Sequence, residues 1–398
     1  MIHHLFVLDF VMIIILQKRK RQNCMKAYYV TETTNRQILQ DMIYIVYVVI
    51  LLLTFCSCQQ EGGQEGLEFD CTTSNVEDWE KYLDLVECVP LEAPDSLGLG
   101  DAYKCVFGGG RMVYWDYSRK ELYSYATDGR YLGKIGAEGR SKSEYIGIKD
   151  IFLDKDGERL YVLDELGILS YDMKTGEFVN REKPELPDFY DYCKFAVLNP
   201  GHYLLFNPQP HGLGTVIDYH DGEWKDLRKA GFCQHVCERF YYSSNQLRVI
   251  SDYGDFFIDT YQDGGLSRAV TFKFSNPLPE EKKPRDFRSF GRIAEERDWC
   301  KCIRDACETK RWIFANVEGS EQKLHWVFGD KKTGKALFGL MNFDDGLQVV
   351  GGDEDCFYGI LYPEMVSDKS YLKDWVKASH SEEEPQPMLV KFRVRDED

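Results

Sequence analysis

Cysteine and histidine are the residues of this chain that could most directly do chemistry, and they gather in two places. The stretch CQHVC at 233–237 combines two thiols with an imidazole, and Cys300, Cys302 and Cys307 lie close together in the sequence. Thiolates and imidazoles are zinc ligands. Neither place has the paired C-x-x-C spacing that is typical of a zinc site. Two alternatives to a metal site stay open for these cysteines: they form disulfides in an oxidising compartment, or they are small buried hydrophobic residues.

Motifs of other chemistry are missing from the sequence. It contains no G-x-S-x-G nucleophile elbow, no H-E-x-x-H helix and no phosphate-binding loop. Asp128, Asp221 and Asp263 each precede a glycine. Aspartate is favoured in such turns, so turn geometry accounts for these residues without a role in acid–base chemistry. Asp116 and Asp164 end strand-like runs. The sequence therefore identifies no catalytic residue and predicts no cofactor, although calcium or zinc stays possible.

A recurring hairpin is the element that would position any site. In SYATDGRYLGKIG, Ser124 to Gly136, two β-rich runs meet at Asp128-Gly129, a strong signal for a two-residue type I′ turn with positive φ at both residues. Similar hairpins follow, most of them at intervals of about 45 residues. Their turn glycines are Gly176, Gly222, Gly264 and Gly334. Further strand-like runs precede most copies, so each unit supplies four short antiparallel strands, as in a β-propeller blade.

The two ends of the repeating region predict how the ring closes. The final stretch alternates Met388, Val390, Phe392 and Val394 with a second set of residues, which has the period of a strand. The second set is Leu389, Lys391, Arg393 and Arg395. Near the start, 82–91 is a strand without a blade of its own. Because an open stack of sheets leaves exposed edges, we expect this strand to complete a sixth blade. The predicted fold is all-β, a six-bladed β-propeller closed by its N- and C-terminal strands.

Two segments interrupt the repeat. An insertion over about 277–305 holds three prolines and then Ile293, Cys300, Ile303 and Cys307 at roughly helical spacing, which predicts a short helical insertion. A second excursion precedes the final strand. Loops of this kind lie on a propeller face and can shape a binding site.

The N-terminus has the features of a targeting signal. We assign 42–57 as a lipoprotein signal peptide, because an uncharged apolar run ends just before Cys58, the expected lipidated residue. An ordinary cleaved signal peptide or an uncleaved anchor is the alternative. Residues 58–77 read as a tether and 78–398 as the propeller. The upstream segment 1–41 suggests a start assigned too early, with Met25 as the natural one; otherwise its apolar run is an extra membrane element.

The chain resembles the NHL-like six-bladed β-propeller lipoproteins of gut Bacteroidota. The resemblance covers most of 78–395 and is densest between Val89 and Asp164, with VPLEAPDSLG and IKDIFLDKDGERLYVLD. That family carries a Gly-Pro-Gly-Glu-Tyr-like loop after its first hairpin; here Glu144 and Tyr145 match, while 141–143 read Ser-Lys-Ser. The resemblance implies the fold and a cell-envelope location but no activity. Because Gln59 is not the aspartate that retains some bacterial lipoproteins at the inner membrane, we expect the outer membrane.

Charge and loop composition define the functional hypotheses. A formal net charge of −17 argues against nucleic acid as a partner. We expect a non-catalytic binding module for a glycan, peptide or protein, anchored to the membrane by its lipid. The alternatives are a metal-dependent propeller hydrolase or lyase acting over the central channel, and an envelope scaffold. The candidate ligand-face loop carries Arg140, Lys142, Glu144 and Tyr145, whose positive charges contrast with the acidic body; the alternative is that Tyr145 packs under the next blade.

Overall fold

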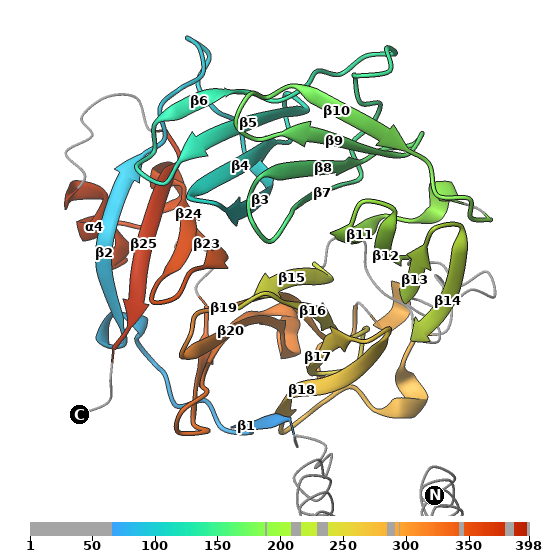
Figure 1. The fold of residues 1–398 in the computed structure, drawn as a ribbon. Coiled ribbons are helices and arrows are strands. Elements are labelled where there is room, and N and C mark those ends of the chain that lie inside the picture. The colour runs from blue at the N-terminus through green and yellow to red at the C-terminus, as the bar shows by residue number, and fades with distance from the viewer. Residues whose placement is uncertain are drawn as a thin grey trace, which may run out of the picture. The chain divides into compact units, whose positions relative to one another are not determined.

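The computed structural model describes residues 66–187, 189–207, 216–228, 238–284, 291–293, 295–341, 346–378 and 386–395. All of them belong to one compact unit, Glu65–Asp398. Their strands form six sheets arranged as the blades of a ring (Figure 1). The predicted six-bladed β-propeller is confirmed.

The first three blades follow each other along the chain, each running from the centre outward. Blade 1 contains β3 (Ala102–Gly108), β4 (Arg111–Asp116), β5 (Glu121–Ala126) and β6 (Tyr131–Lys134). Blade 2 contains β7 (Asp150–Leu153), β8 (Arg159–Leu163), β9 (Ile168–Asp172) and β10 (Phe178–Glu182). Blade 3 contains β11 (Lys194–Asn199), β12 (His202–Phe206), β13 (Val216–His220) and β14 (Glu223–Arg228).

The last three blades continue the ring and carry its irregular features. Blade 4 contains β15 (Phe240–Ser243), β16 (Gln246–Ile250), β17 (Phe257–Gln262) and β18 (Gly265–Phe274). Blade 5 contains β19 (Cys302–Glu308), β20 (Trp312–Glu318), β21 (Leu324–Asp330) and β22 (Ala336–Leu340). Blade 6 contains β23 (Leu347–Gly352), β24 (Phe357–Leu361), β25 (Met388–Val394) and, outermost, β2 (Leu83–Pro90).

The seam of the ring lies in blade 6. β2 pairs antiparallel with β25, with Leu83 opposite Val394 and Pro90 opposite Met388. Phe392, at the middle of β25, is fully buried and packs against Phe357 with ring centroids 5.8 Å apart. The N-terminal strand therefore closes the blade that the C-terminal strand enters, as the alternating pattern of the final stretch predicts.

The hairpin turns use two geometries. Asp221-Gly222 and Asp263-Gly264 have positive φ at both residues, as a type I′ turn requires. The turn at Asp128-Gly129 differs from the sequence prediction, because only Gly129 has positive φ (84°). Ala126 N donates to Arg130 O, so the loop holds three residues and glycine takes the left-handed position at its end.

An unexpected strand lengthens blade 4. β1 (Leu67–Cys71) pairs parallel with the outer edge of β18, inside the segment that the sequence marks as a tether. Phe69 is fully buried, stacks on Phe272, and occupies the space over Gly329, where a Cβ would come within 2.5 Å of its ring. The chain then crosses to blade 5, where Asn75 and Trp79 bond to the backbone of β22. We call 66–79 the strap.

The apolar core lies between neighbouring blades. One cluster joins blades 5 and 6 through Trp326, Phe328 and Phe357, and another joins blades 2 and 3 through Phe152 and Phe195. The alternation of each strand buries one side chain against each neighbouring sheet. This packing holds the six innermost strands around one axis.

Helices are few among the described residues. Residues 291–293 are helical inside the predicted insertion, and α4 (Leu372–Ala378) lies in the second excursion. Ile303 and Cys307, whose spacing suggested a helix, lie on β19 instead, because this strand forms the inner wall of blade 5. No helix of the described residues is long and apolar enough to cross a membrane.

Candidate functional site: the central cavity

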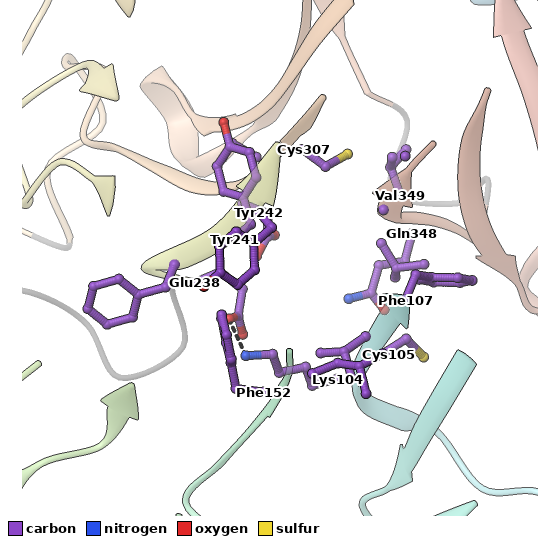
Figure 2. A pocket seen from close by; sticks show the side chains of 18 of the residues that line it. Lys104, Cys105, Phe107, Phe152, Glu238, Tyr241, Tyr242, Cys307, Gln348 and Val349 are labelled. Atoms are coloured by element: carbon purple, nitrogen blue, oxygen red, sulfur yellow. Dashed lines mark ion pairs between the residues drawn. The ribbon is translucent and has the colours of Figure 1, made fainter. Parts of the chain in front are cut away.

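The inner strands enclose a cavity of about 490 Å³ on the ring axis. Strands β3, β7, β11, β15, β19 and β23 contact one another in turn around this axis. We call the face of the ring at the N-terminal ends of these strands the upper face, and the opposite face the lower face. Figure 2 shows side chains from β3, β15, β19 and β23 turned toward the same space. The cavity is therefore built from residues of every blade.

Four charged side chains form a ring of ion pairs at the cavity: Lys104, Lys194 and Glu238 line it, and Asp150 is buried beside them. Lys104 Nζ lies 2.8 Å from Asp150 Oδ1 and 2.6 Å from Glu238 Oε2. Lys194 Nζ bonds the same two carboxylates, 2.8 Å from Glu238 and 3.6 Å from Asp150. Lys104, Asp150 and Lys194 belong to the innermost strands of blades 1 to 3, and Glu238 lies two residues before β15. The pairing fixes the first strands of four blades to one another.

The pKa values of this charge ring follow from burial and mutual attraction. Burial raises the pKa of Asp150 despite the two lysines beside it. For Glu238 burial acts in the same direction, but Lys104 and Lys194 outweigh it and lower its pKa to about 2. The two carboxylates raise the pKa of Lys194 against the effect of burial. With two lysines and two acids, the ring is close to neutral.

Arg304 and Asp305 lie beside this ring on β19 and face fewer partners. Burial, followed by the charge of Glu238, raises the pKa of Asp305 to about 6. Asn316 Nδ2 donates a long hydrogen bond of 3.4 Å to the carboxyl of Asp305. Arg304 Nε is buried and has no hydrogen-bond partner within the described part of the chain. Both residues line the cavity, where a polar ligand could pair with them.

Aromatic rings form the upper mouth of the cavity. Tyr103 stacks on Tyr117 with centroids 5.6 Å apart and planes within 16°, and packs on Trp115 at 4.4 Å. Tyr117 is 64% exposed and Tyr103 37% exposed. Lys194 Nζ lies 5.9 Å from the Tyr103 ring centroid. Exposed rigid rings at a cavity mouth offer a ligand apolar surface with a hydroxyl at the edge.

The lower part of the wall is held by a single buried carboxylate, Glu308. It accepts hydrogen bonds from Tyr241 Oη at 2.9 Å, Ser243 Oγ at 2.8 Å and Arg248 Nε at 2.9 Å. Lys331 Nζ adds an ion pair at 3.1 Å. Burial opposes its charge, but Arg248 and Lys331 lower the pKa of Glu308. This fully bonded group is structural support between blades 4 and 5.

The cysteines give no sign of a metal centre among the residues that are described. No group of three or more His, Cys, Asp or Glu side chains there could hold a metal ion. Cys302 and Cys307 lie on β19 and Cys300 lies just before it, and Cys300 and Cys307 are free thiols. Burial raises the pKa of Cys307, which keeps it protonated and unreactive. Residues 233–237 lie outside the described residues.

The loop predicted from the sequence lies on the upper face, between β6 and β7, and does not line the cavity. Tyr145 is fully buried in the core between blades 1 and 2. Glu144 accepts a hydrogen bond from Ser141 N at 2.8 Å, while Arg140 and Lys142 are exposed. A ligand-binding role for this loop stays a prediction. Cys58 lies outside the described residues.

The cavity residues escaped the sequence analysis because each blade supplies only a few of them. Their one local signal is a lysine inside an otherwise apolar innermost run, as in AYKCVF at 102–107 and KFAVL at 194–198. A charged residue there must find a partner from another blade. The number of residues between such a lysine and its partner in the sequence is not fixed, so the partner cannot be identified from the sequence alone.

Comparisons with known proteins support the fold and are silent on chemistry. A family model described as "Domain of unknown function (DUF4934)" matches residues 69–398. No curated protein matches the sequence.

Two crystal structures share the architecture. A Bacteroides fragilis protein, named as a candidate for export, is 15% identical with a TM-score of 0.66, over 83% of this chain and 99% of that one. A DUF4221 family member from Bacteroides vulgatus is 8% identical with a TM-score of 0.54, over 79% of this chain and 99% of that one. At these identities the likeness shows the fold alone.

Proposed function

Because this chain belongs to the DUF4934 family, whose function is unknown, we propose its role from its own geometry. It is a binding protein of the cell envelope whose propeller takes up a ligand at the upper mouth of the central cavity without changing it chemically. The ligand is a glycan, a peptide or a segment of a protein partner. The resemblance to NHL-like propeller lipoproteins supports this proposal, as does the Bacteroides fragilis neighbour that is named as a candidate for export.

The observation that carries the proposal is the stacked pair Tyr103 and Tyr117. Their exposed rings stand at the opening of a cavity of about 490 Å³ whose wall holds charged groups. Most monomeric proteins place such rings inside, and exposed aromatic side chains that border a cavity are typical of binding sites. The mutually paired lysines and acids of the wall give a rigid, pre-formed site.

A ligand screen with matched variants tests this proposal. The purified protein is screened by ligand-detected NMR against neutral oligosaccharides, acidic oligosaccharides and short peptides. Tyr117→Ala should weaken binding of the ligand found at least tenfold with an unchanged melting temperature, because its ring is exposed. Trp224→Ala, an exposed aromatic on β14 away from the cavity, is the control.

Two outcomes would contradict a non-catalytic role at this mouth. Equal affinity of wild type and Tyr117→Ala for every ligand would place binding elsewhere. Stoichiometric calcium or zinc in the purified protein, together with turnover of a bound ligand, would favour the metal-dependent enzyme.

A further inference from the structure

A second cavity of about 480 Å³ opens on the lower face, beside the central one. Hairpin turns of blades 3 and 4 surround it: the turn between β11 and β12, the turn between β15 and β16, and the turn between β17 and β18. Leu198 and Leu247 supply apolar surface within it. Lys155 and Tyr242 line both cavities, so the two are immediate neighbours.

Tyr242 is held rigidly at the junction. Its hydroxyl donates to Val197 O at 2.9 Å, and its ring packs on Phe152 with centroids 5.6 Å apart. Figure 2 shows Tyr242 among the residues that line the central cavity. A ligand that follows both cavities therefore passes a fixed aromatic surface at the midpoint, which requires a chain of several units.

The second cavity is bordered by neutral side-chain amides. Asn199, Asn245, Gln246 and Gln262 line it, and none of their side chains has a hydrogen bond to the rest of the described structure. An amide both donates and accepts, which matches a hydroxyl group that does the same. Among the described residues that line the cavity, the acidic and basic side chains besides His202 are Lys155 and Asp263, of opposite sign. The cavity thus lacks the surplus charge that an ionic ligand would need.

A positioned histidine adds one more polar group. His202 Nε2 lies 2.8 Å from Asp218 Oδ1, and Tyr261 Oη donates to Asp218 Oδ2 at 2.7 Å. This arrangement fixes the imidazole and the phenol at the cavity wall, where both line it. The strands β16 and β17, which carry Gln246 and Gln262, are paired on both sides, so they offer no open edge to an added peptide strand.

We propose that the lower face binds a neutral oligosaccharide of several sugar units, which runs from the central cavity across the amides of blades 3 and 4. This inference rests on the proposed binding function and names its ligand class. Pyranose faces pack on Tyr242 and Tyr261, and ring hydroxyls pair with the four amides.

Calorimetric titration with neutral hexose oligosaccharides of two, four and six units tests the inference. Affinity should rise at least tenfold from the dimer to the hexamer, because only longer chains reach both cavities. The variant Gln246→Ala/Gln262→Ala should abolish this gain while leaving dimer binding and the melting temperature unchanged. Asn180→Ala, an exposed amide on β10 outside both cavities, is the control.

The outcomes separate this inference from the proposed function. An affinity that does not depend on saccharide length, or that is the same in wild type and in the double variant, overturns the extended site. The Tyr117→Ala variant still tests binding at the upper mouth independently. Binding of acidic saccharides or peptides in preference to all neutral ones overturns the ligand class. Absence of binding by the whole neutral series overturns the inference as well.

Discussion

At the scale of single residues, the described part of the central cavity contains charged side chains that are ion-paired with one another and a carboxyl group that is not. The ring of Lys104, Asp150, Lys194 and Glu238 is internally paired, whereas Asp305 keeps its carboxyl next to Glu238 with one long hydrogen bond. Burying a charge costs free energy unless a partner compensates for it. The paired residues should therefore support folding, and Asp305 should oppose it once ionised.

Asp305→Asn should remove a pH-dependent cost. The pKa of Asp305 is raised to about 6, so the folded state binds a proton that the unfolded state has already lost above pH 4. Wild-type stability should therefore fall relative to the variant as pH rises from 4 to 6, by at most about 3 kcal/mol, and level off above. Urea unfolding of both proteins between pH 4 and 8 measures this difference. A constant difference across that range would contradict the raised pKa.

Lys194→Met should destabilise the protein strongly. The change leaves Asp150 and Glu238 with Lys104 as their only lysine, and breaking a buried ion pair costs about 3–5 kcal/mol. Adding Glu238→Gln to this variant should restore part of the loss, because it removes the excess negative charge. A double-mutant cycle by urea unfolding reports the coupling. Additive effects of the two changes would show that the residues do not interact.

At the scale of elements, the strap protects two sheet edges at once. β1 covers the outer edge of β18, and the residues after it bond to the outer strand of blade 5. Exposed strand edges invite pairing with other chains. The strap therefore contributes to solubility as well as to stability.

Asn75→Ala tests the second half of the strap. Asn75 Nδ2 donates to Ala336 O at 2.8 Å, and its Oδ1 accepts from Phe338 N at 2.7 Å, so its side chain substitutes for a strand residue. The loss of both bonds should cost about 1–2 kcal/mol. Thermal unfolding measures it, with the exposed neighbour Thr73→Ala as control. Equal melting temperatures of the two variants would show that the side-chain bonds contribute nothing.

At the scale of the whole molecule, closure joins distant parts of the sequence. β25 lies between β2 and β24, so the seam depends on pairing at both of its edges. The seam also buries the cluster around Phe392 and Trp375. Blade 6 is thus the one blade assembled from two ends of the repeating region.

Deletion of 388–398 should open the ring. It removes β25 from the interior of blade 6, exposing edges of β24 and β2 and the apolar surface of blade 5 beneath it. We expect a lower melting temperature and oligomers or aggregates in light scattering. Deletion of 396–398 alone, which spares β25, is the control. A monomeric protein with an unchanged melting temperature would contradict closure through this strand.

Cys58→Ser tests the proposed lipid anchor. Several acyl chains hold a protein on a membrane firmly, so the variant should leave the membrane fraction. Gln59 is not the aspartate that retains some bacterial lipoproteins at the inner membrane, so wild type should fractionate with the outer membrane. Immunoblots of separated membranes measure both. Full membrane retention of the variant would rule out this anchor.

The sequence predicts the fold well because the fold is local. The turn glycines Gly129, Gly176, Gly222, Gly264 and Gly334 all have positive φ in the structure. β1 went unpredicted, because LEFDC carries no signal for pairing with residues 270–274, far away in the chain. The cavity was missed for the same reason. Lys104, Lys194 and Glu238 meet only after the ring has closed, so no local spacing describes them.

The strap also determines how the protein would respond to mechanical force. The chain enters the propeller through β1, so tension applied at Gly66 reaches the ladder with β18 before it reaches the seam. When tension acts along the strand, all hydrogen bonds of that parallel ladder share it in shear. Asn75 and Trp79 hold the chain a second time on blade 5. The strap thus takes up the force before it reaches β2. The seam between β2 and β25 can therefore stay paired while the N-terminal segment is pulled.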